Sequence, residues 1–253
     1  LLTGKGLDDY IAAGIFDDHE CTSFTEAAER IEKGQWIMIR EGSAAHNLTN
    51  LIELFEEPYS HRCLLVTDDK HVSDLESVGH IDAIIRHAVK LGKSVFTGIR
   101  MATIQAATRF HLIDQGAIAP GYKANLLVLD DLDEVTVRDV YHMGKKVVDH
   151  GKVIPFPNPF IEDDIWQKVR YSFHLNEIKP EDLYVKPLSN TYRVIRIIPG
   201  GLINEEVIAH TDFSKQNGVD LDQDIVKLAV FERHHNTGHF GVGYVQGTWL
   251  QEG

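Results

Sequence analysis

The sequence has few cysteines, no long apolar run and little positive charge, and each shortage excludes a class of protein. Two cysteines, Cys21 and Cys63, are too few for a disulfide scaffold and fit a reducing compartment. No apolar run approaches the roughly 18–20 residues that a bilayer requires, and the first residues do not resemble a signal peptide. We therefore expect a cytoplasmic protein without a membrane partner.

The charge balance is acidic, with 25 Lys and Arg against 38 Asp and Glu and a formal net charge of −13. Such a surface disfavours nucleic acid as a partner, because Lys and Arg must neutralise its phosphates. The acidic charge does not disfavour a small neutral substrate. The 253 residues, 43% of them hydrophobic, suffice for one large domain or two smaller ones. Because no Met begins the sequence, we expect it to start inside a longer protein.

The first half alternates helix-like and strand-like segments. Apolar residues predict strands at 15–19, 36–39 and 63–66, of which the last two are continuous runs typical of strands buried on both faces. Helices are predicted over 6–13, 23–33, 48–56, 81–91 and 99–110. Ser23 or Thr25 is expected to cap the second helix. Strands that alternate with helices indicate a parallel sheet.

The pattern changes after residue 112. A turn-rich segment leads into a predicted strand at 125–129, and two further short strands, 135–140 and 145–148, flank a turn at 142–144. These strands predict a small β unit. Three prolines at 155, 157 and 159 predict a linker. Beyond it, strands at 192–198 and 225–232 indicate a further α/β segment.

Polar clusters follow three of the predicted strands, at Asp17–Glu20, Arg40–Ser43 and Thr67–Asp69. Chemistry in parallel sheets is located at the C-terminal ends of the strands. His19 lies among carboxylates that could fix its tautomer, and a neutral imidazole is a good ligand for a divalent metal. The alternative is a solvated acidic turn with an incidental histidine.

Asp68 and Asp69 end another buried strand, where an ionised carboxylate is costly unless it is paired or binds a metal. The alternative is a helix cap or a turn aspartate. Adjacent side chains point in different directions, so we expect only one of the two to face a site.

Several phrases in order along the chain resemble the adenine deaminase family of the amidohydrolase superfamily. They are Leu2–Leu7, Tyr10–Ile15, Asp18–Glu20, Ile39–Ser43, Thr67–His71, Met101–Ala107, Gly116–Leu129 and Phe231–His235. The resemblance implies an α/β fold, with residues 1–112 forming the C-terminal half of a metal-dependent (β/α)8 barrel. It further implies a small β-sandwich unit at 113–157 and an extra, incomplete C-terminal α/β domain at 158–253.

The resemblance also assigns the site. His19 matches a metal ligand at the end of the sixth barrel strand, and Asp68 matches an aspartate after the eighth strand that binds metal and shuttles protons. By the same match, Glu20 and Asp69 are expected to hold a metal ligand in place or to contact the substrate.

The same match places the loop after the seventh strand at Arg40, Glu41 and Ser43. These side chains are candidates for positioning the substrate. The alternative, which the pattern favours, is a solvated turn.

The implied reaction is hydrolytic deamination of free adenine to hypoxanthine and ammonia, as in purine salvage, by a homo-oligomeric enzyme. A divalent metal pair, Mn or Fe with Zn as the alternative, would activate water. Three of the family's ligand groups, on its first, fourth and fifth strands, have no counterpart here, so we expect a fragment that is inactive alone. The alternatives are another amidohydrolase, acting on a cyclic amide or a different nucleobase, and a non-catalytic fragment. His234, His235 and His239 could be ligands by type, but a structural role is expected.

Overall fold

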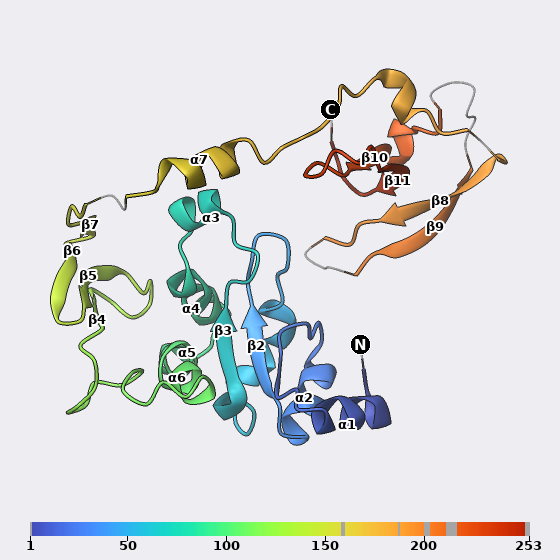
Figure 1. The fold of residues 1–253 in the computed structure, drawn as a ribbon. Helices are drawn as coiled ribbons and strands as arrows, with labels where there is room; N and C mark the ends of the chain where they lie inside the picture. The colour runs from blue at the N-terminus through green and yellow to red at the C-terminus, as the bar shows by residue number, and fades with distance from the viewer. Residues whose placement is uncertain (1, 158–159, 187, 200–202, 211–216, 251–253) are drawn as a thin grey trace. The chain divides into compact units, whose positions relative to one another are not determined.

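The computed structural model describes residues 2–157, 160–186, 188–199, 203–210 and 217–250 (Figure 1). The chain divides into two compact units, residues 1–156 and 157–253. Among the described residues, no helix is long and apolar enough to span a bilayer.

The first unit contains a sheet of three parallel strands in the order β1-β2-β3. They are β1 (Asp17–Asp18), β2 (Trp36–Arg40) and β3 (Cys63–Val66). All three run in the same direction, so their C-terminal ends meet at one edge of the sheet. Strands β2 and β3 lie side by side in Figure 1. The predicted parallel sheet is therefore confirmed, although β1 is shorter than expected.

Helices pack around this sheet, with α2 against β2 and α4, α5 and α6 against β3 (Figure 1). The helical elements are α1 (Gly4–Ala12), α2 (Phe24–Glu32), α3 (Val72–Ser77), α4 (Ile81–Lys90), α5 (Val95–Ala102) and α6 (Ile104–Arg109), with the 3-10 helices η1 (Thr49–Phe55) and η2 (Ser60–Arg62). The predicted cap of α2 is confirmed at Ser23, whose hydroxyl accepts a hydrogen bond from the backbone N–H of Glu26.

Two helical predictions differ from the structure, and one helix was not predicted. The helix expected at 48–56 is the 3-10 helix η1, in which residues three apart align, so Leu51 and Leu54 are both buried. The helix expected at 99–110 breaks at Thr103, whose backbone leaves the helical region and whose hydroxyl donates to the Ile99 carbonyl. Helix α3 was not predicted, because it has no buried residue and therefore no apolar face.

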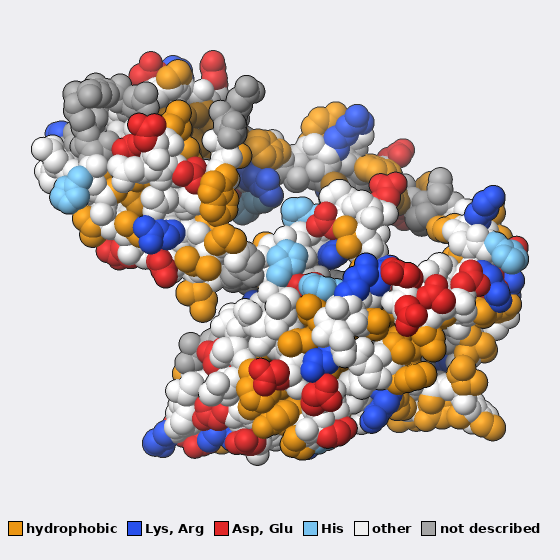
Figure 2. Space-filling view, turned by 180° about the vertical axis from the view of Figure 1, so that it is seen from behind, with side chains coloured by type: hydrophobic (Ala, Val, Ile, Leu, Met, Phe, Trp, Pro, Cys, Tyr) orange, Lys and Arg blue, Asp and Glu red, His pale blue; other side chains and the backbone are white. Residues whose placement is uncertain are grey.

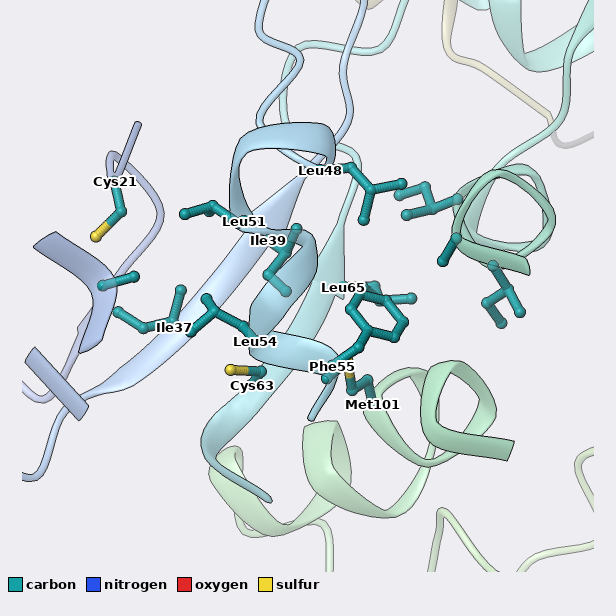
Figure 3. Close-up of a cluster of buried hydrophobic side chains, with 14 of the residues drawn as sticks. Cys21, Ile37, Ile39, Leu48, Leu51, Leu54, Phe55, Cys63, Leu65 and Met101 are labelled. Atoms are coloured by element: carbon teal, nitrogen blue, oxygen red, sulfur yellow. The ribbon is translucent and has the colours of Figure 1, made fainter. Parts of the chain in front are cut away.

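Buried side chains from several elements form the core beneath the strand ends (Figure 3). Ile37 and Ile39 of β2 are fully buried, as are Cys63 of β3 and Met101 of α5. Burying each large apolar side chain contributes about 1.5–3 kcal/mol relative to leaving it in water. This packing fixes where the polar residues that follow each strand can lie.

An antiparallel sheet, ordered β4-β5-β6-β7, completes the first unit. Its strands are β4 (Leu126–Leu129), β5 (Val137–His142), β6 (Lys145–Asp149) and β7 (Lys152–Val153). Met143 and Gly144 both have positive φ, as a tight turn between right-twisted strands requires. The three strands and the turn expected here are confirmed.

The second unit is a four-stranded sheet ordered β10-β11-β8-β9, with α7 preceding it in the chain. Its elements are α7 (Asp163–Arg170), η3 (Pro180–Leu183), β8 (Thr191–Arg196), β9 (Glu205–His210), η4 (Leu221–Gln223), β10 (Ile225–Phe231) and β11 (Phe240–Gln246). Val194, Ala209, Ile225 and Tyr244 form its small core. Many hydrophobic side chains elsewhere on the chain are exposed (Figure 2).

Candidate active site at the strand ends

The parallel sheet brings His19 and Asp68 together, although they follow different strands. His19 Nε2 lies 3.7 Å from Asp68 Oδ1 and 3.3 Å from Glu20 Oε1. The side chains of His19 and Glu20 are each 46% exposed and that of Asp68 is 31% exposed, so solvent and a small molecule can reach all three. One nitrogen of an imidazole thus faces two carboxylates at an accessible surface.

Arg40 lies beneath this group as the last residue of β2, and it is 1% exposed. Its Nη2 is 2.9 Å from Glu20 Oε2, and its Nη1 is 3.6 Å from Asp68 Oδ2. The solvated turn that the sequence favoured at this position is therefore wrong, because Arg40 is part of a buried strand. Its Nε and Nη1 find no hydrogen-bond partner among the described residues. A buried cation thus faces both carboxylates from below.

The backbone separates Asp68 from its neighbour Asp69. Asp68 adopts a φ of 53°, in the left-handed region that few residues other than glycine occupy. Such conformations cost about 1–3 kcal/mol and concentrate at functional sites. The unusual backbone turns Asp68 toward His19 and leaves Asp69 to a different partner.

Asp69 holds the loop that follows β2. Its oxygens accept hydrogen bonds from the backbone N–H groups of Ser43, at 3.2 Å, and Ala44, at 2.9 Å. Burial of the carboxyl opposes ionisation, but these hydrogen bonds outweigh it and hold the pKa of Asp69 below its usual range. Gly42 is required beside it, since a Cβ there would lie 1.7 Å from Asp69 Oδ1. Asp69 is therefore a support for the loop.

The remaining predicted residues, Glu41 and Ser43, are also held by contacts. Glu41 is 8% exposed, and its two oxygens face His46 Nδ1 at 2.9 Å and His87 Nδ1 at 3.3 Å. Ser43 Oγ donates to Asp74 and accepts from the backbone N–H of His71. The expected solvated turn is therefore wrong for Glu41, whereas Ser43 does lie in a bend and is half-buried. Glu41 and Ser43 line an open cleft of about 630 Å³, and His19 and Asp68 are not among its lining residues.

The donors present fit a metal in type and spacing, but they are few. Two ligand atoms that are each about 2.0–2.2 Å from one ion can be separated as His19 Nε2 and Asp68 Oδ1 are. Within the part of the chain that the structure describes, no group of three or more His, Cys, Asp or Glu could hold a metal. Within the described residues, His19 and Asp68 therefore offer two donors of suitable type and spacing.

The histidines near the C-terminal end lie on a loop that one carboxylate organises. Glu232 accepts hydrogen bonds from the backbone N–H groups of His234, His235 and Thr237, at 2.7, 2.9 and 3.1 Å. The ring of His234 contacts the carbonyl of Ser172. These contacts fix the conformation of the loop, which is the structural role expected for its histidines.

This loop yields a prediction for acid conditions. The hydrogen bonds from His235, Thr237 and His234 lower the pKa of Glu232 from 4.5 to about 2. A carboxyl whose pKa falls on folding contributes stability above its unfolded pKa and loses it as the pH drops through the folded pKa. We expect Glu232→Gln to lower the unfolding temperature of the second unit at pH 7, and the difference from wild type to shrink between pH 4.5 and 2. Exposed Glu177, substituted in the same way, is the control. A difference that is unchanged over this range would contradict the role of Glu232.

Comparisons with known proteins agree with this architecture. The model of the amidohydrolase family matches residues 2–147, and that of the adenine deaminase C-terminal domain matches residues 202–253. Adenine deaminase 2 of Carboxydothermus hydrogenoformans is 42% identical over 256 residues, and adenine deaminase of Petrotoga mobilis is 41% identical over 254. Each match covers 100% of this chain and 44% of the relative, so the chain spans less than half the length of these proteins.

A solved structure is similar in fold. The β-aspartyl dipeptidase of Fervidobacterium islandicum AW-1 is 19% identical, with a TM-score of 0.51, over 60% of this chain and 44% of that one. The expected partial-barrel α/β fold is confirmed at this coarse level.

Proposed function

The chain belongs to the amidohydrolase family, and on that premise we propose that the protein is an adenine deaminase, which hydrolyses adenine to hypoxanthine and ammonia. The observation that carries this proposal is the meeting of His19 and Asp68, 3.7 Å apart, at the C-terminal ends of parallel strands. The similarity of the whole chain to adenine deaminases supports the choice of substrate.

His19 and Asp68 would hold a divalent metal, because an imidazole nitrogen and a carboxylate oxygen converge there. The family is generally metal-dependent, and we propose a pair of Mn or Fe ions, with Zn as the alternative. When bound there, such an ion would supply a water molecule of lowered pKa. Two metal ions would require further ligands beyond His19 and Asp68.

Asp68, Arg40 and Glu20 would have different roles in the reaction. Asp68 takes a proton from the attacking water and returns it to the purine or to the leaving amine. Arg40 faces its second oxygen from below, at 3.6 Å, and keeps the carboxylate oriented. Glu20 is held by the same arginine, and its other oxygen lies 3.3 Å from His19 Nε2, the nitrogen proposed to bind the ion, so Glu20 places a second carboxylate beside the metal position.

The loop after β2 would contact adenine. Ser43 and Glu41 are fixed by their own partners, which gives the loop a defined shape beside the site. We also propose that β4–β7 belong to the small β-sandwich unit and that residues 158–253 form part of the extra C-terminal domain. The homo-oligomer, the cytoplasmic location and the role in purine salvage stay predictions.

A substrate panel tests the function. The intact protein, loaded in turn with Mn, Fe and Zn, is incubated with adenine, cytosine and hydantoin. We expect ammonia and hypoxanthine to form from adenine in equal amounts and no comparable turnover of the others. Turnover of hydantoin or cytosine in preference to adenine would favour another amidohydrolase activity. Absence of turnover with every metal and every substrate would contradict the enzyme assignment.

A further inference from the structure

A buried ion pair lies directly behind the strand end that carries His19. Arg30 of α2 is 1% exposed, and its Nε donates to Asp18 Oδ2 at 3.0 Å. Its other two nitrogens donate to the carbonyls of Glu26 and Leu2, both at 3.2 Å. Every nitrogen of this guanidinium has a partner, so the position of Arg30 is fixed by the helix and by the core around it.

The second oxygen of Asp18 shapes the turn. Asp18 Oδ1 accepts from the backbone N–H of Glu20 at 2.6 Å, and the thiol of Cys21 lies within 3.9 Å of the same oxygen. A carboxylate that accepts from the N–H two residues later closes an Asx turn. His19 is the residue enclosed by that turn, so the carboxylate defines the backbone on both sides of it.

We propose that Asp18, anchored by Arg30, is the positioning residue that directs His19 toward Asp68 and Glu20 toward His19 and Arg40. The inference rests on the proposed function, which makes this group the reaction centre. One oxygen of Asp18 is tied to a buried cation and the other to the turn, so a shift of either contact moves His19. Partners that orient a metal ligand typically contribute about 10–100-fold in metal affinity or activity.

The chain contains a matched control on the same strand. Asp17 precedes Asp18 in β1, and consecutive side chains of a strand point to opposite faces. Asp17 pairs with Arg109 at the end of α6, which makes a second Asp–Arg pair of the same chemistry. No described contact of Asp17 involves the turn that holds His19. A disturbed Asp–Arg pair would therefore affect the Asp17 and Asp18 variants alike, whereas a disturbed orientation of His19 would appear only in the Asp18 variant.

The test compares Asp18→Glu with Asp17→Glu in the intact protein. Glutamate keeps the charge opposite its arginine, but its longer side chain cannot close the turn onto the Glu20 N–H. We expect Asp18→Glu to lower metal affinity and kcat/KM for adenine by about 10–100-fold. Asp17→Glu is expected to leave both close to wild type, since it leaves the turn untouched. In metal-free protein labelled with 15N-histidine, the His19 ring signal, assigned with His19→Asn, should broaden or move only in Asp18→Glu.

Equal metal affinity, activity and His19 signal in the two variants would overturn the proposal. If Asp18→Glu does not fold, Arg30→Lys decides in the same assays: a loss of at least 10-fold with a changed His19 signal supports positioning, and wild-type behaviour overturns it. The metal-free His19 signal is independent of the substrate, so a wild type that is inactive on adenine would contradict the proposed function and leave this test standing.

Discussion

Replacing Asp68 by asparagine is expected to lower kcat for adenine by at least about 10²–10⁴-fold, the usual contribution of a general acid–base group. Asparagine nearly preserves the shape of the side chain but cannot accept a proton and return it. Asp68 is suited to that task, since it is 31% exposed and its Oδ1 faces His19 Nε2. Steady-state rates at saturating adenine, normalised to bound metal, measure the effect.

The adjacent aspartate is the control for that experiment. Asp69→Asn is expected to reduce thermal stability more than kcat, because Asp69 accepts hydrogen bonds from Ser43 and Ala44 and does not face His19 in any described contact. An amide can keep one of these hydrogen bonds, but its nitrogen opposes the other donor. A larger loss of kcat in Asp69→Asn than in Asp68→Asn would show that Asp69, and not Asp68, transfers the proton.

The positions of His19 and Asp68 could be predicted because local patterns determine them. The apolar run at 63–66 is buried on both faces up to Val66, whereas in the run at 36–39 only Ile37 and Ile39 are buried. In both cases polar residues follow where the run ends. Parallel strands align their C-terminal ends, so residues distant in sequence meet. Strand order brings both residues to the same end of the sheet, and the backbone at Asp68 and the turn around His19 complete their approach across β2.

Burial of the supporting charges could not be predicted in the same way. Arg40 is followed by Glu41, Gly42 and Ser43, which together have the composition of a solvated turn. Its burial depends on the flanking strands, whose packing no local pattern contains. The histidine partners of Glu41 come from a loop and from α4, and no spacing in the sequence relates them.

The Asp18–Arg30 pair was missed for a related reason. Arg30 belongs to a helix, where charged residues are usually solvated, and its burial comes with partners distant in sequence, Asp18 of β1 and the Leu2 carbonyl. The division of roles between Asp68 and Asp69 likewise depends on the backbone, since the φ of 53° at Asp68 directs the two carboxylates apart. A pair of adjacent aspartates contains no signal of that turn.

Replacing His19 by asparagine is expected to remove most of the bound metal and the deaminase activity together. Its Nε2 faces Asp68 Oδ1 at 3.7 Å, and an amide is a much weaker ligand than an imidazole for a divalent transition metal. Asp68 would be left to bind the ion without its nitrogen partner. Elemental analysis of the intact protein after gel filtration, paired with ammonia release from adenine, measures both losses in one preparation.

His61→Asn is the matched control for this loss of metal. His61 is 54% exposed, close to the 46% of His19, and its Nδ1 lies 3.7 Å from Glu57, the same separation as between His19 and Asp68. It belongs to η2, before the start of β3, and is therefore far along the strand from the ends that form the site. If His61→Asn keeps its full metal content and His19→Asn loses it, His19 is a metal ligand and not merely an exposed histidine beside a carboxylate. Full metal content and normal deamination in His19→Asn would mean that the ion is held without His19, and the strand-end assignment would fail.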